Sequence, residues 1–342
     1  MCRLALGSLP HSPSSRTRKA HGMSLKVLIN ANFFGKTQIQ QRVADMLAEQ
    51  ALWVEDADAA ISALPSADAL ICPDRFYSAT IAEAVRHAAP KLRWIQLLTA
   101  GYDRAKQHGV PAHITVCNAG PAYAPAVAMH AVALLLALQR RLPTLLANQQ
   151  RHAWDRTWTA ELTTPATSTI AVIGFGPIGR EIGRLLRALG ARVVAVTRRG
   201  LPDPNADEIV SGEHLRDVLK RADALVVAAS SDESTRGLIG ERELRACKPT
   251  AVLVNIARGA LVDARALGAA LRHGTIAGAG IDVTDPEPLP ADDPLWEAPH
   301  LIVTPHCAGE CGAIAGERIA ALACDNLRRF IDGASLMHVV QL

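Results

Sequence analysis

Three side chains able to act together on a carbonyl group lie in the second half of the chain. Each follows an apolar run that predicts a strand: Arg258 after Ala251–Ala257, Glu287 after Ala277–Asp282, and His306 after Leu301–Thr304. A guanidinium binds a carboxylate and polarises a neighbouring carbonyl, while an imidazolium gives a proton to the carbonyl oxygen. A glutamate bonded to that imidazole fixes its tautomer and stabilises its protonated form. Together they predict reduction of a 2-oxo acid.

Each of these residues also has an ordinary interpretation. Arg258 taken alone fits a structural ion pair, Glu287 a loop carboxylate, and His306 is one of 12 histidines. Their shared position after three strands favours a catalytic set, because parallel α/β sheets bind ligands at the carboxyl ends of strands. His306, Cys307 and Cys311 also suggest a metal cluster, but no second ligand pair has zinc spacing, so we expect no metal.

A glycine-rich loop stands between an apolar run and an amphipathic segment. Thr169–Ile173 leads into Gly174, Gly176 and Gly179, in the order GxGxxG, and then into a helical pattern. In that context the first glycine permits a tight turn, the second lets a pyrophosphate approach, and the third allows close packing. Pro177 and Ile178 begin the helix, whose N-terminus attracts phosphate. The alternative is an ordinary βα turn that happens to contain glycine.

The next strand, Arg192–Thr197, ends where an NAD-specific site usually carries an acidic residue for the ribose. This chain has Thr197, Arg198 and Arg199 instead. A guanidinium binds a 2′-phosphate that a carboxylate would repel, so NADP is the preferred cofactor, with NAD as the second choice. The competing interpretation is two solvated arginines.

Strands and helices alternate along the chain, which predicts parallel sheets of α/β class. Two such runs joined by a long helix indicate two domains with a cleft between them. Besides the strands already named, the patterns predict strands at Lys26–Asn30, Ala69–Cys72, Arg93–Leu98, Thr115–Asn118 and Ala224–Ala229, and helices at Thr37–Gln50, Ala79–Ala88, Pro125–Leu142, Ile178–Leu189, Ala264–His273 and Ile319–Ile331.

The composition excludes several classes of protein. The 342 residues carry a net charge of only +3, and residues 1–22 hold four basic residues and no acid. The rest is nearly neutral, which argues against a nucleic-acid surface. Seven scattered cysteines and no apolar run long enough for a bilayer predict a reduced, cytoplasmic protein with no membrane partner. Residues 1–22 fit a disordered leader or a misassigned start before Met23, with a transit peptide as the alternative.

The motifs resemble those of the D-isomer-specific 2-hydroxyacid dehydrogenase family, and they cover nearly all of the chain after Met23. The absence of a long C-terminal extension disfavours the large phosphoglycerate dehydrogenases, and Glu287 disfavours a formate dehydrogenase. The matching segments are Gly174–Gly179, Val254–Asp263, Ile281–Val283, Pro286–Leu289 and Thr304–His306, with weaker matches at Leu98–Asp103 and Ser234–Gly240.

The resemblance implies two Rossmann-like or flavodoxin-like doubly wound domains. The cofactor domain, residues 125–308, is inserted in a substrate domain made of residues 24–124 and 309–342. It also implies a homodimer and a small 2-oxo acid substrate, such as glyoxylate or hydroxypyruvate, reduced to the D-2-hydroxy acid. Backbone amides at Ala100, Gly101 and Tyr102 would bind the substrate carboxylate. Asp282 and the backbone of Ile256 and Ala308 would position the nicotinamide, and Ser230 would contact the cofactor. Separately from the resemblance, Leu97, Leu98, Tyr102 and Trp296 are candidate specificity positions.

Some positions depart from the family pattern. Met129 precedes His130 where an acidic residue is common, Ser230 replaces a frequent proline, and Cys307, Glu310 and Cys311 follow the catalytic histidine. These changes leave Arg258, Glu287 and His306 in place. Retention of the three residues leaves two alternatives open: a nucleotide-sensing interaction protein similar to the C-terminal-binding-protein corepressors, and an inactive cofactor-binding paralogue.

Overall fold

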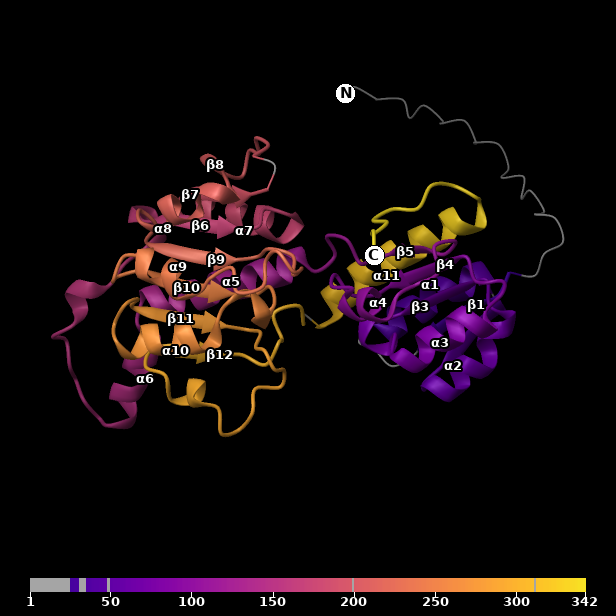
Figure 1. The fold of residues 1–342 in the computed structure, drawn as a ribbon, viewed down its shortest axis with the longest axis horizontal. Helices are drawn as coiled ribbons and strands as arrows, with labels where there is room; N and C mark the ends of the chain where they lie inside the picture. The colour runs from indigo at the N-terminus through magenta and orange to yellow at the C-terminus, as the bar shows by residue number, and fades with distance from the viewer. Residues whose placement is uncertain (1–24, 31–34, 48–49, 199, 311) are drawn as a thin grey trace, which may run out of the picture.

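Two parallel β-sheets, each with helices on both faces, form two lobes that lie side by side (Figure 1). This arrangement confirms the predicted fold class. The predicted leader, Arg199 and Cys311 lie outside the described residues. The computed structural model describes residues 25–30, 35–47, 50–198, 200–310 and 312–342.

The first lobe contains five short strands whose side chains are mostly buried. Such runs favour parallel pairing, because helices cover both faces of the sheet. One face packs against α2, α3 and α4, and the other against α1 and the C-terminal helix α11. The strand order is β2 (Ala51–Val54), β1 (Val27–Asn30), β3 (Ala69–Cys72), β4 (Trp94–Leu97) and β5 (Thr115–Cys117); the helices are α1 (Lys36–Leu47), α2 (Ala57–Ala63), α3 (Ala79–Ala88), α4 (Asp103–His108) and α11 (Gly312–Ile331).

The second lobe contains a seven-stranded parallel sheet. Helices α5 and α7 pack on one face, and α8, α9 and α10 on the other. The order is β12 (Leu301–Val303), β11 (Gly278–Ile281), β10 (Val252–Asn255), β9 (Ala224–Val227), β6 (Thr169–Ile173), β7 (Arg192–Thr197) and β8 (Glu208–Ser211); the helices are α5 (Ala124–Gln139), α6 (Leu142–Gln150), α7 (Pro177–Ala188), α8 (Leu215–Leu219), α9 (Glu241–Ala246) and α10 (Ala264–Arg272).

The structure corrects several predicted elements. The edge strands β2 and β8 and the short helices α2, α4, α8 and α9 were not predicted, because four to seven residues carry little periodicity. The long helix predicted to Leu142 ends at Gln139, since Arg141 adopts a left-handed φ of 49°. A separate helix, α6, begins at the next residue. The last helix begins at Gly312, seven residues before the predicted start.

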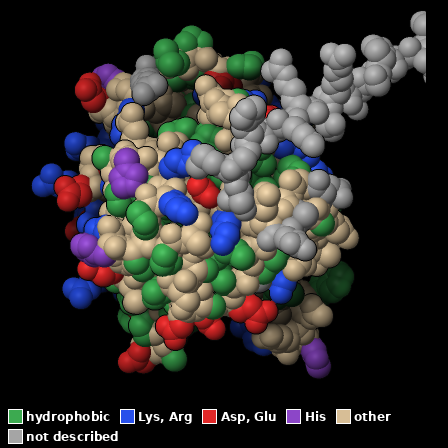
Figure 2. Space-filling model, turned by 90° about the vertical axis from the view of Figure 1, so that its right-hand side faces the viewer, with side chains coloured by type: hydrophobic (Ala, Val, Ile, Leu, Met, Phe, Trp, Pro, Cys, Tyr) green, Lys and Arg blue, Asp and Glu red, His purple; other side chains and the backbone are tan. Residues whose placement is uncertain are grey.

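Charged side chains of both signs and free thiols characterise the described part of the chain. Basic and acidic side chains are both spread over the face in Figure 2, so this face shows no field of a single sign. Among the described residues, no helix combines the length and apolarity that crossing a membrane requires. The five described cysteines are free thiols, and burial raises the pKa of Cys247 and Cys324 to about 11.

Candidate active site

The glycine loop between β6 and α7 has the geometry of a phosphate cradle. Gly174 has a φ of 91°, and a Cβ there would lie 2.4 Å from backbone atoms of Ala229. A Cβ on Gly179 would lie 2.1 Å from the carbonyl oxygen of Gly174. At Gly176, by contrast, no described atom lies within 4 Å of the Cβ position. Two glycines therefore permit close packing and the third leaves open space at the N-terminus of α7, which fits a dinucleotide pyrophosphate.

At the end of β7, Arg198, which the sequence predicts to bind a phosphate, forms an ion pair with Asp232. The Arg198 guanidinium is exposed and lies 3.6 Å from an Asp232 carboxylate oxygen. Hydrogen bonds from Ser234 lower the pKa of Asp232, so this carboxylate is anionic at neutral pH. The Thr197 hydroxyl accepts the N–H of Gly200 at 2.8 Å, which closes the turn after the strand. Ser230 uses its carbonyl to accept the Thr235 hydroxyl at 3.0 Å.

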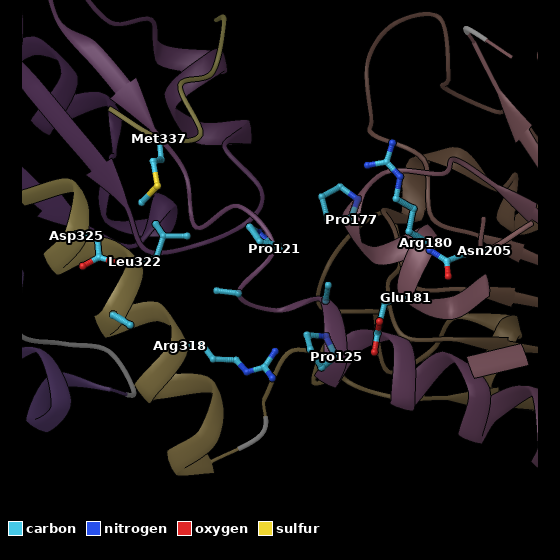
Figure 3. A pocket seen from close by; sticks show the side chains of 13 residues that line it. Pro121, Pro125, Pro177, Arg180, Glu181, Asn205, Arg318, Leu322, Asp325 and Met337 are labelled. Carbon is cyan, nitrogen blue, oxygen red and sulfur yellow. The ribbon is translucent and has the colours of Figure 1, made fainter. Parts of the chain in front are cut away.

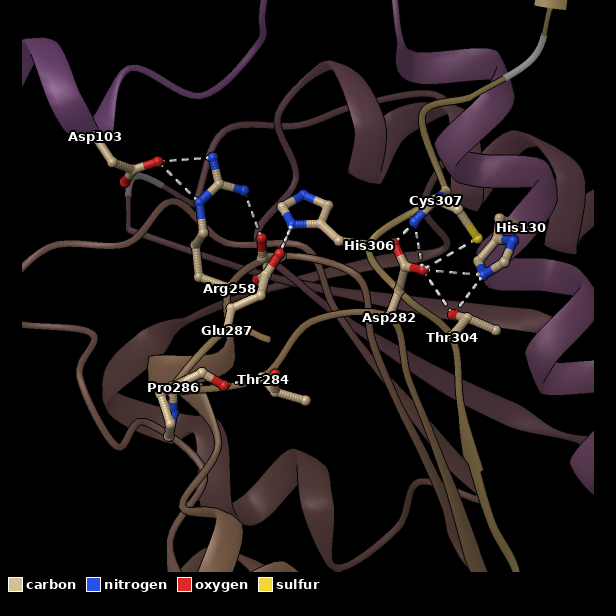
Figure 4. A network of polar contacts seen from close by, with 12 residues as sticks. Asp103, His130, Arg258, Asp282, Thr284, Pro286, Glu287, Thr304, His306 and Cys307 are labelled. Carbon is tan, nitrogen blue, oxygen red and sulfur yellow. Dashed lines mark hydrogen bonds and ion pairs between the residues drawn. The ribbon is translucent and has the colours of Figure 1, made fainter. Parts of the chain in front are cut away.

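The three catalytic candidates follow three adjacent strands. β10, β11 and β12 are neighbours in the sheet, and Arg258, Glu287 and His306 come after them in that order. Neighbouring strands lie about 4.8 Å apart, so their carboxyl ends bring these side chains to one edge. The Glu287 carboxylate accepts a hydrogen bond from His306 Nδ1 at 2.6 Å, which leaves Nε2 for a substrate (Figure 4).

Asp282, at the end of β11, holds the loop that carries the histidine. Its buried carboxylate accepts the N–H of Cys307 and the N–H of Ala308, each at 3.0 Å, and the Thr304 hydroxyl at 2.6 Å. The N–H of His306 donates to the Asp282 carbonyl at 2.8 Å. His306 itself has a φ of 52°, a strained value for a residue with a side chain. Asp282 therefore positions His306.

The nicotinamide contacts expected of Asp282, Ala308 and Ile256 remain predictions. The Asp282 carboxylate and the Ala308 amide bond each other, as just described. Ile256 is buried, and its N–H donates to the Val227 carbonyl at 3.3 Å. Because the N–H groups of Ile256 and Ala308 are already bonded, a carboxamide would have to bond the carbonyl groups of these two residues.

A second group of potential metal ligands surrounds Asp282. The ligand atoms of His130, Asp282 and Cys307 lie within 4.8 Å of one another. His130 Nε2 lies 3.0 Å from the Thr304 hydroxyl, and burial together with Asp282 raises the pKa of the Cys307 thiol. Hydrogen bonding within the protein accounts for this group, and we assign no metal to it.

Arg258 connects the two lobes. Its Nε and one terminal nitrogen both lie 2.9 Å from an Asp103 carboxylate oxygen, and its other terminal nitrogen donates to the Ala257 carbonyl at 2.7 Å (Figure 4). A Cβ on Gly101 would lie 1.8 Å from the guanidinium. The arginine therefore lies directly against the loop whose amides were predicted to bind the substrate carboxylate. Asp103 lies in the segment Leu98–Asp103, which resembles the family pattern, but its position in the sequence did not indicate a partner 155 residues away.

Two of the four specificity positions are corrected. The side chains of Leu97 and Leu98 are buried in the core of the five-stranded lobe, so they are not available to a substrate. Tyr102 is partly buried beside that core. Trp296 is half-exposed, and its indole N–H donates to the Pro290 carbonyl at 2.8 Å.

A cavity of about 520 Å³ lies between the lobes near the first turn of α7 (Figure 3). Pro177 and Arg180 line it from α7, Pro121 from the crossover between lobes, and Arg318 from α11. It adjoins the phosphate loop through Pro177. None of Arg258, Glu287 and His306 lines it, so the catalytic candidates lie outside this cavity.

The contact between Gly101 and Arg258 predicts a selective effect of one methyl group. In Gly101→Ala, the new Cβ meets the end of a flexible side chain, so the guanidinium moves and Tm stays close to that of the parent. The sequence predicts that Arg258 binds the carboxylate of a 2-oxo acid such as glyoxylate, so we expect displacement of the guanidinium to raise KM for that acid about ten- to hundredfold. Gly212→Ala is the matched control, since its Cβ position has no described atom within 4 Å. An unchanged KM in Gly101→Ala would contradict this account.

Comparison with known proteins identifies the family. The profile for the NAD binding domain of D-isomer specific 2-hydroxyacid dehydrogenases matches residues 132–308. The chain is 35% identical over 252 residues to a glyoxylate reductase of Thermococcus gammatolerans, covering 72% of this chain and 75% of that protein. The chain therefore belongs to the D-isomer specific 2-hydroxyacid dehydrogenase family.

Other relatives agree with this assignment. A D-3-phosphoglycerate dehydrogenase of Mycobacterium tuberculosis is 35% identical over 85% of this chain, which spans 54% of that relative's length. A D-isomer specific 2-hydroxyacid dehydrogenase family protein from Aeromonas salmonicida has a TM-score of 0.81 at 26% identity, covering 93% of this chain and 99% of that one. A family member from Xanthobacter autotrophicus Py2, in complex with NADPH and MES, has a TM-score of 0.79 at 25% identity, covering 93% and 98%.

Proposed function

We propose that the protein reduces a small 2-oxo acid, of the glyoxylate or hydroxypyruvate type, to its D-2-hydroxy acid. The observation that carries this proposal is the Glu287–His306 hydrogen bond of 2.6 Å at the same sheet edge as Arg258. The glyoxylate reductase relative supports the substrate class. The phosphoglycerate dehydrogenase relatives support a 2-hydroxy acid product but not its identity, since the chain spans only about half their length.

In the proposed reaction each side chain has one task. Arg258 pairs with the substrate carboxylate and polarises the adjacent carbonyl. A nicotinamide cofactor held at the glycine loop Gly174–Gly179 would supply the hydride that the carbonyl carbon accepts. His306 donates its Nε2 proton to the carbonyl oxygen, so that the C=O bond becomes an alcohol. Glu287 retains its bond to Nδ1 and stabilises the imidazolium before transfer. The histidine then regains a proton from solvent, which its half-exposed side chain permits.

A panel of 2-oxo acids tests this proposal directly. Purified protein would be mixed with NADPH and, one at a time, glyoxylate, hydroxypyruvate, pyruvate and a branched 2-oxo acid, and NADPH absorbance followed. We expect the short acids to give the highest kcat/KM. The absence of turnover with every acid, alongside nucleotide-dependent binding of a protein partner, would favour the nucleotide-sensing alternative.

We also propose that NADPH is the preferred cofactor. The support is Arg198 at the end of β7, together with the absence of an acidic residue at Thr197. The Xanthobacter autotrophicus relative was solved with NADPH. A bound 2′-phosphate would compete with Asp232 for the Arg198 guanidinium. The kcat/KM ratio for NADPH over NADH measures the preference, and a value below one would overturn it.

Replacing Arg198 should affect the two cofactors differently. In Arg198→Ala, we expect kcat/KM for NADPH to fall about tenfold or more, since a charge-assisted hydrogen bond to phosphate contributes roughly 1.5–3 kcal/mol. NADH lacks the 2′-phosphate, so its kcat/KM serves as the internal control and should change little. Steady-state kinetics with both cofactors measures this effect. Equal losses with both would show that Arg198 acts on the fold of the loop and not on the phosphate.

A homodimer formed through the seven-stranded lobe is a further part of the proposal. Apolar side chains are exposed on α5 and α6 and on the segment that follows them. Exposed apolar groups of this kind mark protein interfaces. Light scattering during gel filtration would measure the mass, and a monomer at micromolar concentration would contradict the proposal. The residues concerned are Met129, Leu142, Leu145, Leu146 and Trp154.

A further inference from the structure

The loop after β4 has two of its carbonyl groups held by side chains. The Thr99 hydroxyl donates to the Gly101 carbonyl at 2.8 Å. The Asn118 amide, from the segment after β5, donates to the Ala100 carbonyl at 2.7 Å. These carbonyls belong to the two consecutive peptide units whose N–H groups are those of Gly101 and Tyr102. Both peptide units are therefore fixed in orientation.

The orientation of the carbonyls decides where the two amides point. In a planar trans peptide the N–H is directed opposite to the C=O. With both carbonyls turned toward Thr99 and Asn118, the N–H groups of Gly101 and Tyr102 point away from these side chains. Neither N–H has an acceptor among the residues that the structure describes. Two adjacent donors without protein partners form a site for an anion.

The two supporting side chains are themselves held in place. The Thr99 hydroxyl accepts the N–H of Asp74 at 3.2 Å, and the Asn118 side-chain oxygen accepts the N–H of Gly120 at 3.0 Å. Asp74 in turn accepts the N–H groups of Arg104 and Ala105, at 2.9 and 3.0 Å, and so caps α4. The side chains of Thr99 and Asn118 thus each form hydrogen bonds to two backbone groups, which restricts their rotamers.

The same loop borders the catalytic arginine. The Arg258 guanidinium lies so close to Gly101 that a Cβ there would overlap it. A carboxylate bound to the Gly101 and Tyr102 amides therefore lies within reach of a positive charge from the other lobe. A rotation of either peptide unit would present a carbonyl oxygen to that carboxylate and replace attraction by repulsion.

We propose that Thr99 and Asn118 are positioning residues that direct the Gly101 and Tyr102 amides at the substrate carboxylate. The inference rests on the proposed function, because it assigns the anion as the carboxylate of a 2-oxo acid. Both side chains bond backbone groups, and we assign neither of them a contact with the reacting carbonyl. Their effect is on carboxylate binding, with the amides as intermediaries, and it is separate from proton transfer by His306.

The test compares Thr99→Val, which removes the hydroxyl at nearly constant volume, with Thr99→Ser, which keeps it. We expect Thr99→Val to raise both KM for glyoxylate and the inhibition constant of oxamate, a 2-oxo-acid analogue, about tenfold. Its kcat should fall less, and its Kd for NADPH should stay within twofold of the parent. Thr99→Ser should restore both constants. Asn118→Ala, which releases the other carbonyl, should give the same pattern.

Thr115→Val is the matched control, since Thr115 begins β5 and its hydroxyl makes no hydrogen bond to any residue that the structure describes. Its KM should equal that of the parent. Unchanged KM and oxamate inhibition in both Thr99→Val and Asn118→Ala, beside an active parent, overturn the inference alone. If NADPH binding weakens and Tm falls in parallel with the loss of oxamate binding, the result also counts against the inference, since that pattern shows a general structural role. An inactive parent instead overturns the proposed function.

Discussion

Replacing His306 with glutamine is expected to lower kcat by about 10³-fold, within the range that positioned acid–base groups contribute. Glutamine retains a polar side chain but has no proton that it can transfer and recover near neutral pH. The Glu287 bond at 2.6 Å occupies Nδ1, so Nε2 is the atom that we propose as the proton donor and that this substitution removes. Steady-state turnover of the best 2-oxo acid from the panel measures the effect.

Two further measurements make this prediction specific. The Kd for NADPH should be unchanged in His306→Gln, because the role proposed for this side chain is on the substrate carbonyl and not at the phosphate loop. His87→Gln is the matched control, since His87 is exposed on α3 and pairs only loosely with Glu83 at 3.2 Å. A His306→Gln variant with kcat within threefold of the parent would falsify the assignment of the proton donor.

Replacing Arg258 with alanine is expected to reduce kcat/KM by roughly 10²- to 10³-fold through both constants. In the proposed mechanism the guanidinium contacts the carboxylate in the ground state, so its loss raises KM. It also polarises the carbonyl in the transition state, so its loss lowers kcat. Arg258→Lys should recover only part of the loss, because an ammonium group cannot make the forked contact. Full kinetic curves with saturating NADPH separate the two constants.

The ion pair between Arg258 and Asp103 joins the lobes, so the effect of losing it has to be separated from the effect of losing substrate binding. Arg258→Ala also removes the ion pair with Asp103, which lies partly in solvent and so contributes no more than about 1 kcal/mol. Asp103→Asn removes the same ion pair but retains the guanidinium. If Asp103→Asn lost as much kcat/KM as Arg258→Ala, the arginine would act by joining the lobes and not by binding substrate. Arg245→Ala, an exposed arginine on α9, controls for loss of charge alone.

Much of the fold was accessible from local patterns. Short apolar runs alternating with helical segments predict parallel strands, and the buried strands β6, β10 and β11 occur where those runs lie. The edge strand β8 was not predicted because its four residues are only partly buried and show no clear period. The end of α5 was misplaced because one left-handed residue, Arg141, ends the helix just before another begins at Leu142.

The catalytic candidates were accessible for a related reason. Arg258, Glu287 and His306 each follow a strand, and parallel strands place their carboxyl ends at one edge whatever the connections between them. The supporting residues had no such signal. Asn118, Thr99 and Asp103 are single polar residues whose partners are chosen by the packing of one loop on another.

What the amino-acid sequence determined by itself was the class of fold, the phosphate loop and the order of the three catalytic candidates, because these depend on local spacing and on the uniform direction of parallel strands. Tertiary structure alone decided that Arg258 reaches across to Asp103, 155 residues away, and that His130 meets Thr304, 174 residues away. It also decided the direction of the Gly101 and Tyr102 amides. Hydrogen bonds between distant segments form only after the lobes have folded and packed, and no spacing along the chain encodes them.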